Sequence, residues 1–144
     1  PIIFGAAKPV PVDPFNLKEG RKDMSIVALA GPLTNLLLAI TAAIIFKILD
    51  AVPIVFPSVI GLILALTAKY NLLLAVFNLI PIPPLDGSKV FAIILPDREA
   101  AAYLSLGSMG MFIIFFLLFF PIGPFNLGEV VFRLVQLGLV ALGF

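Results

Sequence analysis

Long apolar segments separated by short polar or proline-rich breaks dominate the chain. Each segment approaches the roughly 20 residues that are needed to cross a bilayer. The pattern predicts helices over residues 25–48, 58–80, 102–120 and 126–143, with a short helix from about Ser88 to Leu95 between the second and the third. The expected fold is therefore an all-α polytopic membrane protein with about four transmembrane helices.

Residues 1–24 contain too many prolines for a helix. Pro9 and Pro11 are two residues apart, so in an extended strand both remove amide donors from the same edge. The amide of Val10 stays on the other edge, which could pair with another strand. We expect either a membrane-associated β segment with one edge able to pair or an ordinary interfacial loop.

The composition agrees with a membrane protein, because 62% of the residues are hydrophobic and 12% are charged. Soluble proteins carry about 25% charged residues. The net charge of +1 gives no sign of a nucleic-acid partner, and without cysteine there is no disulfide or thiolate ligand. We expect one membrane domain over 1–144, divided into a re-entrant segment (1–24), core helices (25–96) and C-terminal transmembrane helices (97–144).

Basic residues fall mostly where the first predicted helix begins and the second ends. These are Lys8, Lys18, Arg21, Lys22, Lys89 and Arg98, whereas Lys47 lies alone at the opposite turn. By the positive-inside rule, the richer side is cytoplasmic. Lys69 lies in the middle of the second span, which is costly unless its side chain snorkels or lies near an interface.

Polar residues near helix starts have local interpretations. Ser25 is expected to cap the first helix, behind a charged stretch. Gly31 and Asn35 share a face of that helix and permit close approach of a neighbour with a hydrogen bond, which packing alone would also explain. Asn126 with Glu129 three residues later predicts a capping box, so Glu129 is interpreted as a cap and not as a catalytic group.

The stretch NLIPIPPLDG, residues 78–87, interrupts this apolar sequence. Its prolines end a helix, and broken backbone at membrane depth is tolerated only where it is buried in protein or lines a wet cavity. Asp86 is the one acidic residue with long apolar runs on both sides, which suggests that it binds a metal or a proton. The alternative is that Asp86 caps a helix beginning at Ser88. Gly87 allows close backbone approach.

NLIPIPPLDG resembles the Asn-x-x-Pro-x-Pro-x-Leu-Asp-Gly signature of the site-2 protease family, the intramembrane zinc metalloproteases. Every fixed position matches: Asn78, Pro81, Pro83, Leu85, Asp86 and Gly87. AGPLTN is similar to the family's Gly-x-x-x-Asn element at Gly31 and Asn35. FGAAKPVPVDPFNL resembles a family segment that forms a membrane-embedded β element near the active site. The resemblance spans residues 4–87.

The resemblance implies a zinc site in which Asp86 is the third ligand, beside two histidines of a His-Glu-x-x-His helix whose glutamate is the general base. It also implies that the substrate backbone is held extended near the metal, with the strand edge at Val10 adding hydrogen bonds. The substrate-binding residues expected on this basis are Asn78, Pro81, Pro83, Val10 and Asn35.

The sequence has no His-Glu-x-x-His motif and no histidine, so no catalytic residue is expected within this chain. The expected function is part of an intramembrane zinc metalloendopeptidase that cleaves transmembrane substrates in regulated intramembrane proteolysis. Its expected partners are those substrates, the lipid bilayer and a missing N-terminal helix of its own chain. The alternatives are a non-catalytic membrane protein of the same fold that binds transmembrane segments, and a fragment of an ion-coupled transporter. In each case, residues 78–87 are expected toward the cytoplasmic side of a multi-pass protein.

Overall fold

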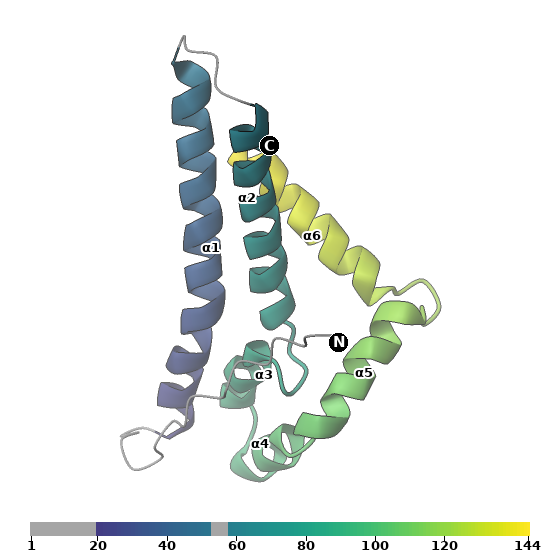
Figure 1. The fold of residues 1–144 in the computed structure, drawn as a ribbon. Helices are drawn as coiled ribbons and strands as arrows, with labels where there is room; N and C mark the ends of the chain where they lie inside the picture. Colours follow the sequence, from purple (N-terminus) through teal and green to yellow (C-terminus); the bar gives the residue numbers. More distant parts are fainter. Residues whose placement is uncertain (1–19, 53–57) are drawn as a thin grey trace, which may run out of the picture.

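The computed structural model describes residues 20–52 and 58–144, and this part of the chain is helical (Figure 1). The elements in order are α1 (Arg21–Ala51), α2 (Ser58–Asn78), α3 (Asp86–Phe91), a 3-10 turn η2 (Ala92–Ile94), α4 (Asp97–Leu104), α5 (Gly107–Phe119) and α6 (Leu127–Leu142). Among the described residues, β pairing is limited to an isolated bridge between Ile122 and Phe125. The all-α class is therefore confirmed for this part.

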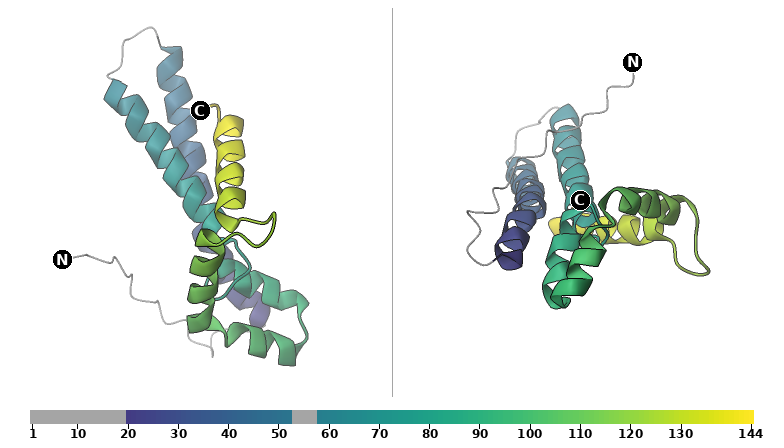
Figure 2. Two further views of the ribbon diagram at one scale, coloured as in Figure 1. Left: turned by 90° about the vertical axis from the view of Figure 1, so that its right-hand side faces the viewer. Right: turned by 90° about the horizontal axis from the view of Figure 1, so that it is seen from below.

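Helices α1 and α2 form a long hairpin, and the shorter elements gather at one end of it. Figures 1 and 2 show α3 and α4 at the end where α1 begins and α2 ends, while α5 and α6 return along the other side of α2. Helix α3 packs on α1, and α6 packs on α2. The segment after α2 is thus enclosed by elements from both halves of the chain.

Small side chains dominate the buried positions of the hairpin. In α1 and α2 these include Ala28, Ala39, Ala42, Ala43, Ala68 and Ala75. In a membrane, helix association depends on close van der Waals packing, and small residues let the two backbones approach. The sequence builds this interface from alanines and directs its large apolar side chains elsewhere.

The main hydrophobic core lies where the end of α2, the following turn, α5 and α6 meet. Ile80 and Leu85 from the turn pack in one cluster with Ile114 of α5, which is fully buried. Helix α6 contributes Leu127, Val131 and Val135. Because these three residues are four apart, they form one stripe along the helix that faces the core.

Two glycines bring the C-terminal helices against the rest of the molecule. A Cβ atom on Gly110 would lie 1.6 Å from the carbonyl oxygen of Pro83, so α5 rests directly on the turn after α2. A Cβ on Gly138 would lie 3.1 Å from a methyl carbon of Leu72, so α6 crosses close to α2 there. The absence of a side chain at each point sets the helix spacing.

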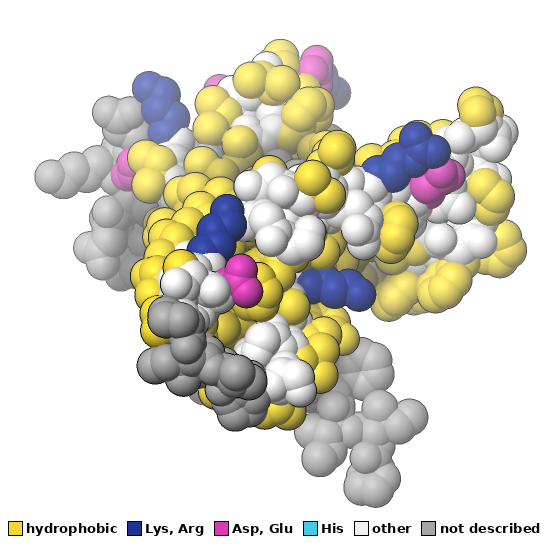
Figure 3. Space-filling model, turned by 90° about the horizontal axis from the view of Figure 1, so that it is seen from above, with side chains coloured by type: hydrophobic (Ala, Val, Ile, Leu, Met, Phe, Trp, Pro, Cys, Tyr) yellow, Lys and Arg dark blue, Asp and Glu magenta, His cyan; other side chains and the backbone are white. Residues whose placement is uncertain are grey.

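Most of the outer surface is apolar. Figure 3 shows hydrophobic side chains over much of the visible face, with a few cations and carboxylates among them. Large exposed apolar residues occur along α1, α2, α5 and α6, for example Leu37, Leu62, Phe112 and Leu137. A soluble monomer rarely exposes such extensive patches, whereas lipid covers them in a membrane protein.

Helix length and hydropathy mark two clear membrane spans. Helices α1, with 31 residues, and α2, with 21, are each long and apolar enough to cross a bilayer. Helix α4 and residues 109–119 qualify only as a pair bent by 72°. Helix α6 has 16 residues. Among residues 20–52 and 58–144, the structure thus supports two spans, or three if the bent pair is one span, and not the four or so that the apolar segments predicted.

The third predicted span and the predicted start of the first span need correction. Residues 102–120 do not form one helix, because the chain turns at Ser105 and Leu106 between α4 and α5. Helix α1 begins at Arg21, with Gly20 as its N-cap at φ 56°, and not after residue 24. Ser25 is therefore inside the helix and buried. The predicted β segment and Val10 otherwise fall in residues 1–19, outside the described residues.

The predicted N-cap of the last helix is confirmed. The side-chain oxygen of Asn126 accepts a hydrogen bond of 3.0 Å from the backbone amide of Glu129. The carboxylate of Glu129 does not complete a capping box, because it accepts hydrogen bonds from Arg133, one turn later. The predicted capping role of the Glu129 carboxylate is therefore wrong, although the backbone amide of Glu129 is capped by Asn126.

We expect Gly110→Ala to lower the stability of the protein by about 1–3 kcal/mol, because its methyl group would overlap the backbone of Pro83 and α5 would have to move. Gly107→Ala is the matched control, since no atom lies within 4 Å of its Cβ position. Thermal unfolding in detergent should show a lower midpoint for Gly110→Ala and an unchanged or higher one for Gly107→Ala. Equal midpoints would contradict the close contact.

Candidate metal-ligand site at the Leu-Asp-Gly turn

The backbone after α2 is broken, but it is well provided with hydrogen bonds. The backbone amide of Ile80 donates a hydrogen bond of 3.1 Å to the carbonyl of Phe77. The amide of Ile82 donates to the carbonyl of Ile80 (2.8 Å), and the amide of Leu85 donates to the carbonyl of Ile82 (3.0 Å). The Pro83–Pro84 peptide is cis within the last of these turns. Unpaired polar backbone is costly away from water, so these turns satisfy backbone groups that a continued helix would otherwise have paired.

One carbonyl of this segment is paired by a distant side chain. The hydroxyl of Tyr103 in α4 donates a hydrogen bond of 2.6 Å to the carbonyl oxygen of Pro81. The ring of Tyr103 also lies edge-on to Phe91 at the end of α3, with ring centroids 5.6 Å apart. Helix α4 therefore supports the proline turn and the short helix after it together.

Helix α3 begins at Asp86 itself. Leu85 is the N-cap in an extended conformation, and its carbonyl accepts hydrogen bonds from both the amide (3.1 Å) and the hydroxyl (2.6 Å) of Ser88. The alternative in which Asp86 caps a helix that starts at Ser88 is therefore wrong. Asp86 is the first helical residue, where a negative charge is stabilised by the helix dipole.

The carboxylate of Asp86 lies between α1 and Lys89. Its Oδ1 accepts a hydrogen bond of 2.8 Å from Nζ of Lys89, and its side chain is 30% exposed. A Cβ on Gly31 of α1 would lie 3.4 Å from its Oδ2. Gly31, predicted as a close-approach position, therefore leaves room for the carboxylate. The sequence motif and the Gly-x-x-x-Asn element meet at this point.

Gly87 fixes the start of α3 against the end of α2. A Cβ there would lie 2.2 Å from the carbonyl oxygen of Leu79 and 2.7 Å from that of Ile80. Its φ is not positive, so space and not backbone conformation requires a glycine. The predicted close backbone approach is confirmed, and it sets the position of Asp86 relative to Asn78.

The other expected site residues lie on the elements around this turn. Asn78 is the last residue of α2 and is half-buried, as is Asn35, one turn after Gly31 in α1. Their amides make no hydrogen bond to the part of the chain that the structure describes, so both remain open to a ligand there. Pro83 is buried in the turn and Pro81 is exposed.

Two residues that hold α3 in place were not identified from the sequence as functional. Arg21 donates through Nη1 to the carbonyls of Ala92 and Leu95, each at 2.8 Å, and also pairs with Asp97. The hydroxyl of Ser25 donates to the carbonyls of Arg21 (2.6 Å) and Lys89 (3.1 Å). The available signal was their spacing of four, which places them on one helix face.

The described residues do not form a complete metal site. Among residues 20–52 and 58–144, no group of three or more His, Cys, Asp or Glu side chains could hold a metal ion. The carboxylate of Asp86 fits as a single oxygen ligand for zinc, because it is partly exposed and held in a defined position. The remaining ligands of a zinc site are not among these residues.

Comparison with known proteins identifies the family. A model of peptidase family M50 matches residues 47–121, which cover the end of α1, all of α2 to α4 and α5. The chain therefore belongs to peptidase family M50, the membrane-embedded site-2 protease family.

The chain is also similar to a bacterial protein described as "Putative zinc metalloprotease YwhC", from Bacillus subtilis (strain 168). The two are 33% identical over 129 residues. The match covers 86% of this chain and 58% of the relative, so the chain spans little more than half of that relative's length. No solved structure matches the chain.

We expect Gly87→Ala to displace α3 and destabilise the protein by about 1–3 kcal/mol, since its methyl group would meet backbone atoms that no side-chain rotation can move. Gly61→Ala is the control, because its Cβ would make only an ordinary contact of 3.5 Å with Phe46. Hydrogen–deuterium exchange should accelerate across residues 86–94 in Gly87→Ala alone. Equal exchange in both variants would refute the contact.

We expect Arg21→Met to loosen α3 and η2, because three hydrogen bonds of one guanidinium are lost. The local stability should fall by about 1–2 kcal/mol, as for bonds made by a charged donor. Arg98→Met is the control, since Arg98 is exposed and makes no such bonds with the described residues. Faster amide exchange at residues 89–95 is expected in Arg21→Met only, and unchanged exchange would exclude this role.

Proposed function

We propose that this chain is the part of an intramembrane zinc metalloendopeptidase that carries the aspartate ligand, and that the whole protein cleaves transmembrane substrates in regulated intramembrane proteolysis. The observation that supports it best is Asp86, a half-buried carboxylate held at the start of α3 against Gly31. Membership of peptidase family M50 and the likeness to a protein described as a zinc metalloprotease agree with this role.

In this proposal, Asp86 supplies one of the zinc ligands. Two histidines and a general-base glutamate would come from a His-Glu-x-x-His helix in a further segment of the protein, beyond these 144 residues. Zinc would supply Lewis acidity for the hydrolysis of a peptide bond. The chain's own contribution is to hold the carboxylate in position through Gly87, Leu85 and Ser88, which fix the start of α3.

Substrate binding would use the polar groups beside this carboxylate. A helical substrate hides its peptide bonds, so it must be unwound and given replacement hydrogen bonds. The amide of Asn78 could bond to an extended substrate backbone, and Asn35 adds a second amide on α1. Pro81 and Pro83 shape the turn against which the substrate would lie. The segment around Val10 would provide a strand edge.

The proposed topology places the ligand toward the cytoplasm. The described cations Arg21, Lys22, Lys89 and Arg98 belong to the elements at the end where α1 begins and α2 ends, where α3 and α4 also lie (Figure 1). Lys47 lies at the opposite end, beside Gly143. With α1, α2 and the returning α5–α6 segment, which ends beside Lys47, crossing the membrane, the domain would have its basic end inside.

A non-catalytic protein of the same fold is the second candidate. The observation in its favour is that Lys89 already neutralises the carboxylate of Asp86 at 2.8 Å. In such a pair, the charge of the carboxylate is compensated without a metal ion. The protein would then bind transmembrane segments through the same turn without cutting them.

Zinc binding by the full-length protein tests the proposal. We expect the purified protein to bind zinc, measured by elemental analysis, and Asp86→Asn to weaken that binding at least about tenfold and abolish cleavage of a membrane-embedded peptide. Asp50→Asn, which removes an exposed carboxylate at the far end of α1, should retain both. Zinc bound to Asp86→Asn with unchanged affinity would overturn the ligand assignment. A wild-type protein without zinc or cleavage would favour the non-catalytic candidate.

A further inference from the structure

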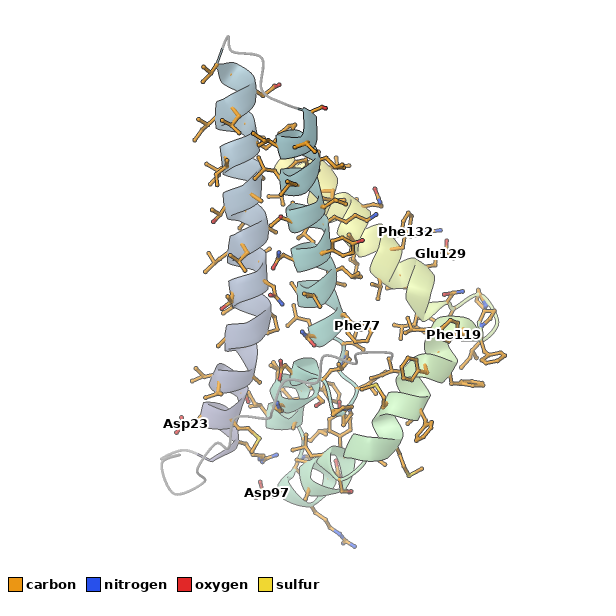
Figure 4. All side chains as sticks on the ribbon, viewed as in Figure 1. Asp23, Phe77, Asp97, Phe119, Glu129 and Phe132 are labelled. Atoms are coloured by element: carbon orange, nitrogen blue, oxygen red, sulfur yellow. The ribbon has the colours of Figure 1, made fainter. Side chains whose placement is uncertain are left out.

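An apolar groove of about 490 Å³ lies between α2 and α6, away from the Asp86 carboxylate. Its walls include Leu73, Leu74 and Phe77 of α2, and Val131, Phe132 and Val135 of α6. Leu118 of α5 also contributes to the lining. Figure 4 labels Phe77 and Phe132, the aromatic residues on the two sides of the groove.

The groove exists because α6 approaches α2 closely at only one end. Near its C-terminus, α6 crosses α2 where Gly138 faces Leu72. Near its N-terminus, α6 lies instead on α5, where a Cβ on Gly128 would be 3.4 Å from the carbonyl oxygen of Leu118. Figure 1 shows α6 diverging from α2 toward α5. The contacts at Gly138 and Gly128 therefore leave a space between α2 and the first half of α6.

One ammonium group lies in the lining of this otherwise apolar groove. Lys69 is exposed, and it makes no ion pair or hydrogen bond with the residues that the structure describes. It lies on α2 about 14 Å from Asn78, at 1.5 Å per residue. Glu129, the acidic residue of α6, is already bonded to Arg133. A cation within a membrane span requires an anion or water, and no described carboxylate fills that role.

A second polar side chain faces the same groove from α6. Gln136 lies in the lining with Lys69, and its amide can donate to an anionic oxygen. The groove therefore combines an apolar floor with two donors. This is the arrangement that suits a molecule with a hydrocarbon chain and a negative head.

We propose that this groove binds one anionic phospholipid, whose phosphate is held by Lys69 and Gln136 and whose acyl chain lies along Phe77 and Leu118. The charge of Lys69 selects an anionic over a zwitterionic lipid. The site is independent of the proposed proteolysis.

Tryptophan fluorescence can test this proposal, because the chain has no tryptophan of its own. Phe132→Trp places one reporter in the groove, with any tryptophan in the rest of the full-length protein replaced by phenylalanine. The protein is reconstituted in phosphatidylcholine vesicles that contain a minor fraction of brominated phosphatidylglycerol or brominated phosphatidylcholine. We expect a roughly five-fold preference for phosphatidylglycerol at this reporter, derived from the quenching.

The variants decide whether Lys69 causes the preference. Lys69→Gln should abolish it and Lys69→Arg should retain it, while Lys47→Gln, near the end of α1 and outside the groove, should leave it unchanged. A second reporter, Phe112→Trp on α5, is 78% exposed outside the groove and should be quenched equally by the two lipids.

Three results would overturn the proposal. The first is equal quenching of Phe132→Trp by the two brominated lipids. The second is a preference that survives in Lys69→Gln or disappears equally in Lys47→Gln, which would indicate general surface charge. The third is no quenching of Phe132→Trp by either lipid, which would mean that another segment of the protein fills the groove.

Discussion

The structure depends on how the broken backbone after α2 is given hydrogen-bond partners. Proline-rich sequence cannot continue a helix, and exposed amides and carbonyls are not tolerated in the apolar part of a membrane. The chain resolves this conflict with successive turns, from Phe77 to Leu85, and with the hydroxyl of Tyr103 on the carbonyl of Pro81. Because the partners come from the turn itself and from α4, this region has one defined shape. The carboxylate of Asp86 inherits its position from that shape.

The same turn determines where the remaining helices lie. Gly87 allows α3 to begin against the carbonyls of Leu79 and Ile80, just after α2, and Gly110 allows α5 to rest on the carbonyl of Pro83. Ile80 and Leu85 then pack with Ile114 and with the apolar stripe of α6. The site and the C-terminal helices are thus parts of one packing unit. A larger side chain in place of either glycine would therefore displace both Asp86 and the packing of the core.

Features that arise from local sequence could be predicted, and those that arise from distant contacts could not. The start of α2, the break at the prolines, the close approach at Gly87 and the cap at Asn126 each follow from a few neighbouring residues. Ser25 does not cap the first helix, because that helix begins at Arg21 and the hydroxyl of Ser25 bonds to the carbonyl of Lys89, 64 residues away. Arg21 bonds to Ala92 and Leu95 over comparable separations, which no local pattern reveals. The bend between α4 and α5 likewise follows from packing against the turn and not from hydropathy.

The two proposed sites lie on different helices, Asp86 at the start of α3 and Lys69 in α2, and they carry opposite charges. Just after α2, the carboxylate of Asp86 can bind a cation, and Lys89 is the only cation of the described chain that pairs with it. Along the side of α2, the ammonium group of Lys69 can bind an anion, and the described residues that line its groove include no carboxylate. A charged side chain is costly in hydrocarbon, so in membrane proteins it is found where an opposite charge, a polar group or water can bind it. In the two proposals, the carboxylate of Asp86 binds a metal ion together with ligands from the rest of the protein, and the ammonium group of Lys69 binds the phosphate of a lipid.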